Sequence, residues 1–196
     1  MLKIRTMPLG LYQTNCYIVN NVTSSKCVVI DPGYDPHVIL DALTRENLEL
    51  EAILLTHGHF DHVGAVRDLA ATTSCRVFLR PEETTMPPQM TAGPLYHTDA
   101  YPSEGKLQVA GIDFAIMHTP GHTPGSVCIL AEDAMFSGDT LFAGSMGRCD
   151  FPGSSIFEMR KSLRRLCALT KDYKVLPGHG KASTLEYEKK NNPFLR

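Results

Sequence analysis

The stretch LLTHGHFDHVGA, residues 54–65, places four groups that can bind a proton or a metal ion within a few positions. Imidazole nitrogens and carboxylate oxygens are ligands that zinc and iron accept. His57 and His59 are two residues apart, so they can share one side of an extended or looped segment and face one ion. Asp61 and His62 follow directly and can face a neighbouring ion. The pattern HxHxDH therefore indicates metal chemistry.

Three further residues of the same kinds come where strand-like runs end. His122 follows FAIMHTPG, Asp139 follows AMFSG and His179 follows KVLPG. Polar groups on loops at strand ends, held by a rigid scaffold, are common at functional sites. A catalytic zinc takes only three protein ligands, so this surplus favours two ions that share a bridging carboxylate. The candidate ligands are His57, His59, Asp61, His62, His122, Asp139 and His179.

For the other histidines and the cysteine thiols, the surrounding sequence gives less support for a metal-binding or catalytic role. A single histidine at a strand end is more often a loop residue than a ligand, so the whole set carries the argument. We expect His37 and His97 at the surface and His118 in a supporting role. Nucleophilic catalysis is the rival chemistry, but no GxSxG motif is present and Cys149 stands alone in a Gly-rich loop. The six cysteines form no CxxC pair and are typical of free thiols in a reducing compartment.

Composition limits the class of protein. The chain has 196 residues, 43% hydrophobic and 20% charged, which is typical of a soluble globular domain with its own core. A net charge of -2 without a basic run disfavours nucleic acid or an anionic membrane as a partner. No apolar segment has the length of a membrane span or a signal peptide, so a cytoplasmic protein is expected. The oligomeric state stays open.

Strand-like and helix-like patterns alternate in the first part of the chain, which indicates an α/β protein. Residues 81–105 then read as a long irregular connection with one helical turn, typical of a functional lid that shapes a pocket. Two sheets with helices outside them would fit, and no linker divides residues 1–196, so a single domain is expected. The predicted strands are 2–7, 15–21, 27–33, 51–56, 75–80, 106–111, 112–119, 126–132, 134–139 and 173–180, and the predicted helices are 36–47, 62–73, about 154–169 and 184–191.

Five motifs together resemble the metallo-β-lactamase superfamily: VIDPG, THGHFDH, TPGHTPGS, SGDTLF and PGHG, in that order and over nearly the whole chain. The resemblance implies a four-layer αββα sandwich, with two mixed sheets, helices outside and two divalent metals at one edge. It also implies a role for each candidate. His57, His59 and His122 would bind the first metal, Asp61, His62 and His179 the second, Asp139 would bridge both, and Asp31 would orient a ligand.

A closer likeness lies in QTNCYIV and GDTLFAGSMGRCDFPGSS, which resemble the glyoxalase II branch, the hydroxyacylglutathione hydrolases. In that branch a basic residue after GDTLF helps to hold the glutathione moiety, and Arg148 matches it. Full-length members continue into a helical domain that binds glutathione. This chain stops at Arg196, soon after PGHG, so it resembles the short, single-domain glyoxalase II-like hydrolases without that domain.

The resemblance predicts a metal-dependent hydrolase of a small thioester or related ester. Water shared by two Zn²⁺ ions would be the nucleophile, with Asp61 and Asp139 as catalytic residues, and iron or manganese are alternative metals. One alternative is a persulfide dioxygenase of the same superfamily, with one iron on His57, His122 and Asp139 or on a similar set of two histidines and a carboxylate. A lactonase or β-lactamase is a weaker option. A non-catalytic metal-binding protein is the alternative from another class.

Overall fold

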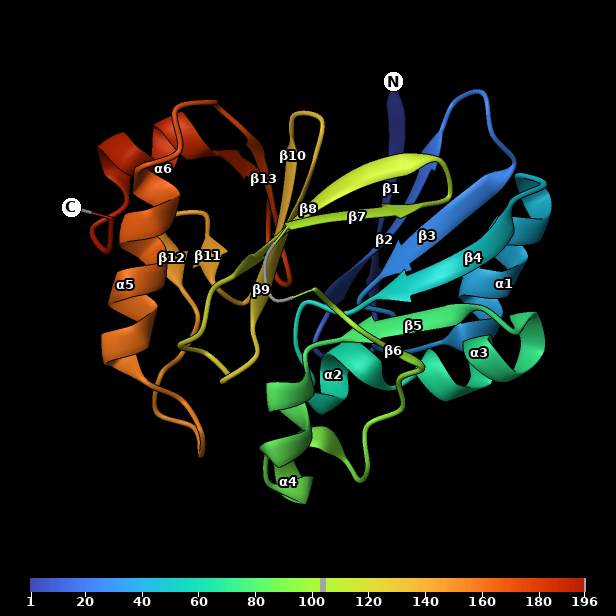
Figure 1. Cartoon of the computed structure of the whole chain (residues 1–196), viewed down its shortest axis with the longest axis horizontal. Helices are drawn as coiled ribbons and strands as arrows, with labels where there is room; N and C mark the ends of the chain where they lie inside the picture. The colour runs from blue at the N-terminus through green and yellow to red at the C-terminus, as the bar shows by residue number, and fades with distance from the viewer. Residues whose placement is uncertain (103–104, 196) are drawn as a thin grey trace.

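The computed structural model describes residues 1–102 and 105–195. Two six-stranded sheets pack face to face and helices cover their outer faces, as Figure 1 shows. This is the four-layer αββα sandwich that the sequence predicts. Residues 103 and 104, at the end of the predicted connection 81–105, lie outside the described residues.

The first sheet contains the N-terminal half of the chain. Its first three strands pair antiparallel and the rest pair parallel, so it is mixed. Helices α1 and α3 cover its outer face (Figure 1). Its strands in spatial order are β1 (Leu2–Leu9), β2 (Thr14–Asn21), β3 (Lys26–Ile30), β4 (Glu49–Leu54), β5 (Arg76–Leu79) and β6 (Asp99–Ala100). Its helices are α1 (Pro36–Arg45), α2 (Phe60–Val63) and α3 (Val66–Thr73).

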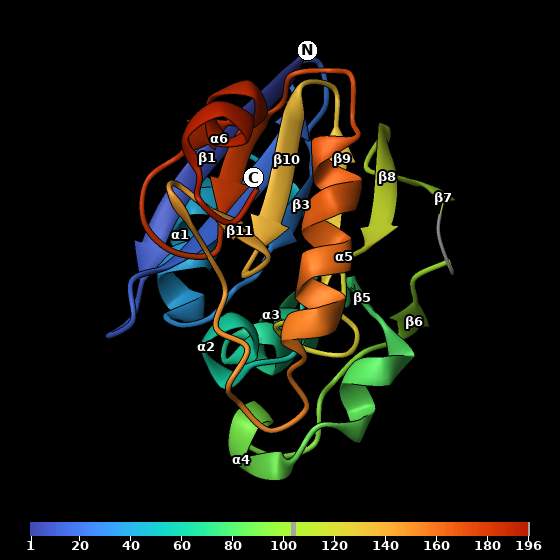
Figure 2. The same cartoon turned by 90° about the vertical axis from the view of Figure 1, so that its left-hand side faces the viewer.

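The second sheet contains the C-terminal half and is also mixed, because β10 pairs with β13 in parallel and the other pairs are antiparallel. Helix α5 crosses its outer face, as Figure 2 shows. The spatial order is β14 (Ser183–Thr184), β13 (Lys174–Pro177), β10 (Ala134–Gly138), β9 (Val127–Ala131), β8 (Ile112–His118) and β7 (Gly105–Val109). The helices are α5 (Ile156–Cys167) and α6 (Leu185–Asn191), and β11 (Leu141–Phe142) pairs with β12 (Ser145–Met146) in a small hairpin.

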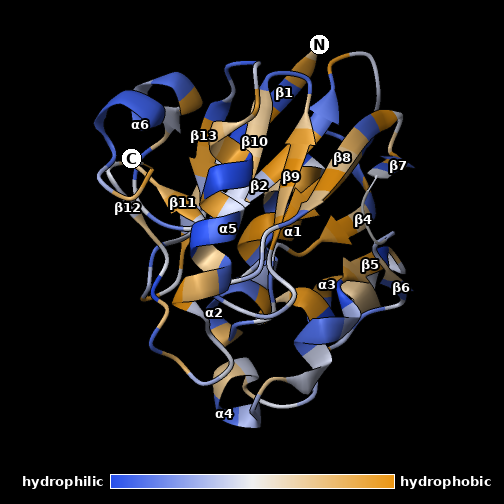
Figure 3. Cartoon of the chain, turned by 60° about the vertical axis from the view of Figure 1, so that its left-hand side comes forward, coloured by the Kyte–Doolittle hydropathy of each residue, from blue (hydrophilic) through white to orange (hydrophobic). Residues whose placement is uncertain are grey.

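The central strands of the two sheets, such as β3, β9 and β10, are buried and mainly apolar on both faces because each sheet is covered on both sides there. In β3, Val28 and Ile30 pack between the sheets against Phe114 and Phe136 of the second sheet. The alternate residue Val29 faces outward and packs in the layer beneath α1 and α3. Figure 3 shows the hydrophobic strands of the second sheet behind the largely hydrophilic outer surface of α5.

Two segments differ from the sequence prediction. The predicted helix 62–73 is two helices, broken at Gly64, because the N–H of Ala65 bonds to the carbonyl of Pro32 at 3.0 Å and the backbone of Gly33 lies against Gly64. The connection 81–105 has more regular structure in its described residues than the one helical turn that the sequence predicts. It forms the 3-10 helix η1 (Pro81–Thr85), the short helix α4 (Pro88–Thr91) and strand β6.

No helix in the described ranges combines the length and the apolar character needed to cross a membrane.

The two sheets bring the predicted strand-end residues to one edge of the sandwich. Asp31 follows β3 and His57 follows β4, and both strands belong to the first sheet. Asp139 and His179 follow β10 and β13, which run parallel, so their carboxyl ends lie together at the edge of the second sheet.

Candidate metal centre

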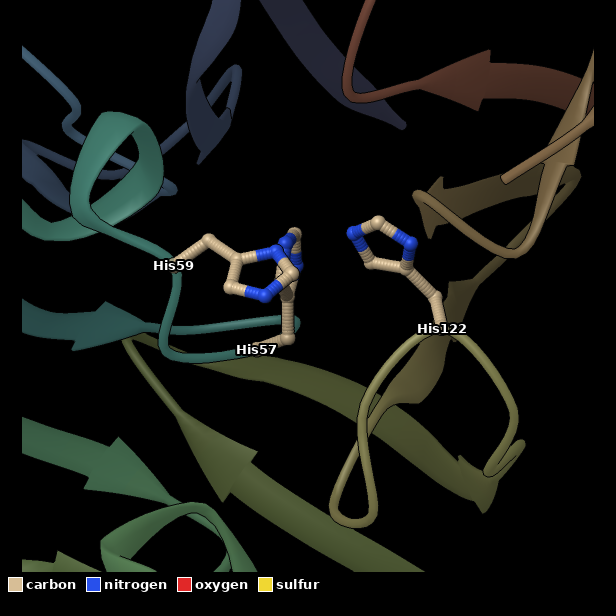
Figure 4. A group of neighbouring side chains, drawn as sticks. All are labelled: His57, His59 and His122. Carbon is tan, nitrogen blue, oxygen red and sulfur yellow. The ribbon is translucent and has the colours of Figure 1, made fainter. Parts of the chain in front are cut away.

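The first cluster of candidate ligands joins the two halves of the chain. His57 and His59 lie in the loop between β4 and α2, and His122 lies in the loop between β8 and β9. Their ligand nitrogens lie within 4.8 Å of one another. Figure 4 shows the three rings pointing toward one another from the two loops. The carbonyl of Thr56 also accepts the N–H of Val127 at 2.9 Å, which ties the two loops to each other.

A second cluster, Asp61, His62 and His179, adjoins the first, with ligand atoms again within 4.8 Å of one another. Nε2 of His179 lies 3.2 Å from Oδ2 of Asp61. Asp139 lies between the clusters, with Oδ1 3.5 Å from Nε2 of His62 and Oδ2 3.4 Å from Nε2 of His122. The structure therefore brings all seven predicted ligand residues together and places the Asp139 carboxylate where one group can face both clusters.

Several buried nitrogen and oxygen atoms of the candidate metal ligands have no hydrogen-bond partner. Burying a polar atom without a partner is costly, so these atoms indicate a binding site for a metal ion. In four of the histidines the atom that faces the cluster is Nε2, and neutral imidazole nitrogens suit zinc and iron. Within residues 1–102 and 105–195, the buried atoms of the centre without a hydrogen-bond partner are Nε2 of His57, His59, His62 and His122 and Oδ1 of Asp139. This donor set fits a metal centre.

The opposite ring nitrogens are held by oxygen atoms. Nδ1 of His62 lies 3.0 Å from Oδ2 of Asp31, and Nδ1 of His122 lies 2.8 Å from the carbonyl of Arg148. Nδ1 of His179 lies 3.2 Å from the carbonyl of Tyr12. A protonated Nδ1 that donates to such an oxygen leaves the lone pair on Nε2, which is the form that binds metals.

Burial and neighbouring charge set the protonation of the metal-free centre. Burial, together with the other imidazoles, lowers the pKa of His57 well below its usual value and that of His59 to about 3. Burial alone would also lower the pKa of His62, but the negative charges of Asp139 and Asp31 outweigh it and raise the pKa well above 6.5. Burial would raise the pKa of Asp139, and the positive charge of His62 reverses this. In the metal-free centre the rings of His57 and His59 are therefore neutral, while His62 is protonated and paired with the ionised Asp139.

Glycines allow the close approach of backbone and ligands. A Cβ on Gly178 would lie 2.2 Å from Oδ1 of Asp139 and 2.6 Å from Cε1 of His62. A Cβ on Gly147 would lie 1.8 Å from the carbonyl oxygen of Asp139. No side chain fits at either position, which explains the glycines in PGHG and SMGRC.

A cavity of about 550 Å³ opens onto the centre, and most of the walls that are not ligands are apolar. Met90 brings helix α4 to its wall, so the connection 81–105 does shape the cavity, as the sequence predicts. The lining residues besides the candidate ligands are Tyr12, Phe60, Met90, Phe142, Arg148 and Phe151. A larger hollow of about 740 Å³ between α5 and residues 193–195 is lined by none of the candidate ligands, so we do not assign the chemistry there.

The residue predicted to contact substrate, Arg148, lines this cavity but already has a partner. Its Nε and Nη2 donate to the two carboxylate oxygens of Asp150 at 2.9 and 2.8 Å. Its guanidinium carbon also lies 4.3 Å from the centre of the Phe151 ring. Asp150, which no sequence motif singles out, balances the charge of Arg148 at the mouth of the cavity.

The remaining histidines and the thiol behave as the sequence predicts. His37 and His97 are exposed. Nε2 of His118 lies 2.9 Å from the carbonyl of Pro124, so this ring supports the loop that carries His122. Burial raises the pKa of the Cys149 thiol, and the nearby charge of Asp150 raises it further. A raised pKa disfavours the thiolate that a nucleophilic cysteine needs.

An αββα sandwich with a cluster of histidines and aspartates at one edge defines a class of metal-binding proteins. Comparison of the sequence with known families places the chain in the same class. Residues 9–179 match the family described as the Metallo-beta-lactamase superfamily, and the chain belongs to that superfamily. The hydroxyacylglutathione hydrolase GloC of Haemophilus influenzae is 32% identical, over 99% of this chain and 98% of that protein.

Solved structures agree with the family. The crystal structure of BLEG-1 B3 metallo-beta-lactamase is similar with a TM-score of 0.91 and 36% identity, over 100% of this chain and 99% of that one. The crystal structure of TTHA1623 in a di-iron-bound form is similar with a TM-score of 0.82 and 36% identity, over 97% of this chain and 100% of that one.

Proposed function

We propose that the chain hydrolyses a small thioester or related ester at a centre of two divalent metal ions. The observation that carries the proposal is the set of buried, unpaired nitrogen and oxygen atoms that face one another beside an open cavity. Membership of the superfamily supports an enzyme of the metallo-hydrolase type. Similarity to a hydroxyacylglutathione hydrolase supports a thioester as the substrate.

In this proposal each cluster would hold one ion. His57, His59 and His122 would hold the first, Asp61, His62 and His179 would hold the second, and the Asp139 carboxylate would serve both. Bound there, two divalent ions would lower the pKa of a shared water and polarise a carbonyl group. Zinc suits this set of imidazole and carboxylate ligands, and similarity to a protein with a di-iron-bound form keeps iron as the alternative.

The chain's own residues would position the reactants. Burial alone would raise the pKa of Asp61, but the hydrogen bond from His179 and the charge of His62 lower it, so its carboxylate stays ionised. The Thr14 hydroxyl donates to Oδ2 of Asp61 at 3.2 Å and restrains it. We assign Asp61 to accept a hydrogen bond from the attacking water, which would orient its lone pair toward the carbonyl.

The cavity walls would hold the rest of the substrate. Tyr12 and Phe60 pack edge to face with ring centres 5.4 Å apart, and Phe142 and Phe151 line the same cavity. These rings would pack against apolar parts of the acyl group or the thiol. Arg148 at the rim would bind a substrate carboxylate, in competition with Asp150.

The test is metal content followed by turnover. Elemental analysis of chain purified without added metal is expected to find about two zinc ions per chain. Hydrolysis should then be measured on hydroxyacylglutathiones, neutral thioesters, simple esters and a β-lactam, the last because of the similarity to BLEG-1. Chelator-treated protein is the control. Metal without turnover on the whole panel would instead support a non-catalytic metal-binding protein.

An iron-dependent persulfide dioxygenase is the second candidate. The similarity to TTHA1623 in its di-iron-bound form favours iron binding by a fold of this kind. About one iron per chain, with oxygen uptake when glutathione persulfide is added, would support this candidate and contradict the hydrolase.

A further inference from the structure

The carboxylate of Glu83 has no role in the proposed chemistry, yet it is completely buried beside the first cluster. Glu83 lies in η1 and its exposed fraction is 0%. Its Oε2 accepts the backbone N–H of Gly58 at 2.6 Å, and its Oε1 accepts the backbone N–H of Gly125 at 2.6 Å. One carboxylate therefore binds two backbone groups from different parts of the chain.

These two glycines belong to the loops that carry the first cluster. Gly58 lies between His57 and His59, after β4 of the first sheet. Gly125 lies three residues after His122, in the loop between β8 and β9 of the second sheet. The Glu83 carboxylate thus connects the two sheets at the point where their loops form the triad of histidines.

Glycine leaves room for this contact at both positions, most tightly at Gly125. A Cβ on Gly125 would lie 2.8 Å from Oε1 of Glu83, so a side chain there would displace the carboxylate. A Cβ on Gly58 would lie 2.7 Å from Cδ1 of Leu95 and 3.1 Å from Oε2 of Glu83, so it would crowd both side chains. The short distances are those of charge-assisted hydrogen bonds, which are about twice as strong as neutral ones.

The loop around His122 is well placed to transmit this restraint. The N–H of Thr119 donates to the carbonyl of Ser126 at 2.8 Å, and the N–H of Gly121 donates to the carbonyl of Thr123 at 3.1 Å. Internal backbone hydrogen bonds therefore make this loop move as one unit. A shift of Gly125 would carry the His122 ring with it, whereas Asp61 and His179 stand on other segments.

We propose that Glu83 is a positioning residue that sets the separation between the His57–His59 loop and the His122 loop. It would thereby raise the metal affinity of the first cluster selectively. The inference rests on the proposed two-metal centre and assigns to it a residue that touches neither the metals nor the substrate.

The test variant is Glu83→Gln, in which an amide NH₂ group, a hydrogen-bond donor, replaces one carboxylate oxygen. This NH₂ group then faces one of the two backbone N–H groups, so one of the two loops loses its hydrogen-bond acceptor. Glu82→Gln is the matched control, because Glu82 lies in the same 3-10 helix and its carboxylate pairs with Arg80. Each change is made in two background variants. His179→Ala weakens the second cluster and leaves the first cluster intact. His122→Ala weakens the first cluster and leaves the second cluster intact.

Zinc affinity is measured by competition with a chromophoric chelator. Glu83→Gln is expected to weaken binding about 10–100-fold in the His179→Ala background, as loss of a supporting contact does. In the His122→Ala background the loss should stay below about 3-fold, and Glu82→Gln should change neither value. Equal losses in the two backgrounds, or no loss in either, would overturn the inference.

Two further measurements keep the inference testable. If Glu83→Gln does not fold, Gly125→Ala displaces the same carboxylate and should give the same selective loss. In the unmutated chain, the amide protons of Gly58 and Gly125 should resonate downfield in a proton–nitrogen NMR spectrum, because both donate to an ionised oxygen. Unmutated chain that binds neither zinc nor iron would instead overturn the proposed function, whereas normal zinc binding unchanged by these variants would overturn only the role of Glu83.

Discussion

Oδ2 of Asp31 lies 3.0 Å from Nδ1 of His62, so the opposite nitrogen of His62 faces the candidate metal ligands. The same oxygen accepts the hydroxyl of Thr56 at 2.5 Å, and that hydroxyl oxygen lies 3.1 Å from Nδ1 of His57. One buried carboxylate therefore orients a histidine of each cluster. Such supporting contacts are part of the design of a metal site.

Replacing Asp31 should weaken both clusters, unlike the loss of Glu83. Asp31→Asn is the variant of choice, because Asp31 has a positive φ of 50° and asparagine tolerates that backbone. Zinc affinity should fall about 10–100-fold at each cluster by chelator competition. Asp35→Asn is the control, because Asp35 has a similar φ of 54° but lies just before α1, where its carboxylate accepts the N–H of Gly10 at 3.3 Å. Unchanged affinity in Asp31→Asn would contradict the orienting role.

Asp139→Ala tests the bridging carboxylate. Its loss removes the group between the clusters and leaves the positive charge of His62 without its largest compensation, since Asp139 raises the pKa of His62 most. We expect elemental analysis to find fewer than two ions per chain and turnover to fall by at least about 100-fold. A variant that kept two ions and full activity would show that the bridging assignment is wrong.

The two clusters should respond differently to pH. In the metal-free chain the pKa of His62 is raised well above 6.5, so this ring is protonated at pH 6.5 and must lose a proton to bind an ion. The pKa of His59 is lowered to about 3 and that of His57 is also lowered, so these rings are already neutral. Acidification should therefore weaken the second cluster first.

That prediction can be measured in the same backgrounds. Zinc affinity in His122→Ala should fall by up to about tenfold per pH unit for each proton displaced as the pH drops from 8 to 6. In His179→Ala the fall should be smaller over this range. The opposite order would contradict the assignment of His62 to the second ion.

Arg148 and Asp150 form an exposed ion pair at the mouth of the cavity, and their effects on an anionic substrate should have opposite signs. Arg148→Ala should raise KM for a thioester that bears a carboxylate by roughly 3–10-fold, with little change in kcat. Asp150→Ala should lower KM, because it frees the guanidinium. A neutral thioester with the same acyl group is the control, and an equal effect on it would exclude charge recognition.

Much of the fold could be predicted because strands buried on both faces are apolar runs that end at glycine or proline. Five of the seven candidate ligands could be predicted because they follow the ends of strand-like runs, namely His57, His59, His122, Asp139 and His179. Asp61 and His62 could be predicted because they complete the pattern HxHxDH. The two-residue strands β6 and β14 could not be predicted, because two residues are too few to show the alternation of apolar and polar side chains that indicates a strand. The break at Gly64 depends on contact with Pro32 and Gly33, which only the packed chain reveals.

Glu83 and Asp150 show what a sequence leaves out. Asp150 pairs with Arg148, two residues before it, but the partners of Glu83 belong to no local motif. Glu83 meets Gly58 and Gly125, which are far from it in the chain and come from different sheets. The sequence around it, PEETT, offers two adjacent glutamates and no sign of which one is buried. Only the topology distinguishes Glu83 from Glu82.

The division of the ligands between the two sheets has a consequence for the order of assembly during synthesis. The first sheet, folded alone, would hold His57, His59, Asp61 and His62 but complete neither triad. His122 completes the first triad when β8 and β9 have formed, and His179 completes the second only when β13, near the end of the chain, has joined β10. Metal loading would thus be a late event, so the ions available to the finished protein would decide which metal it carries.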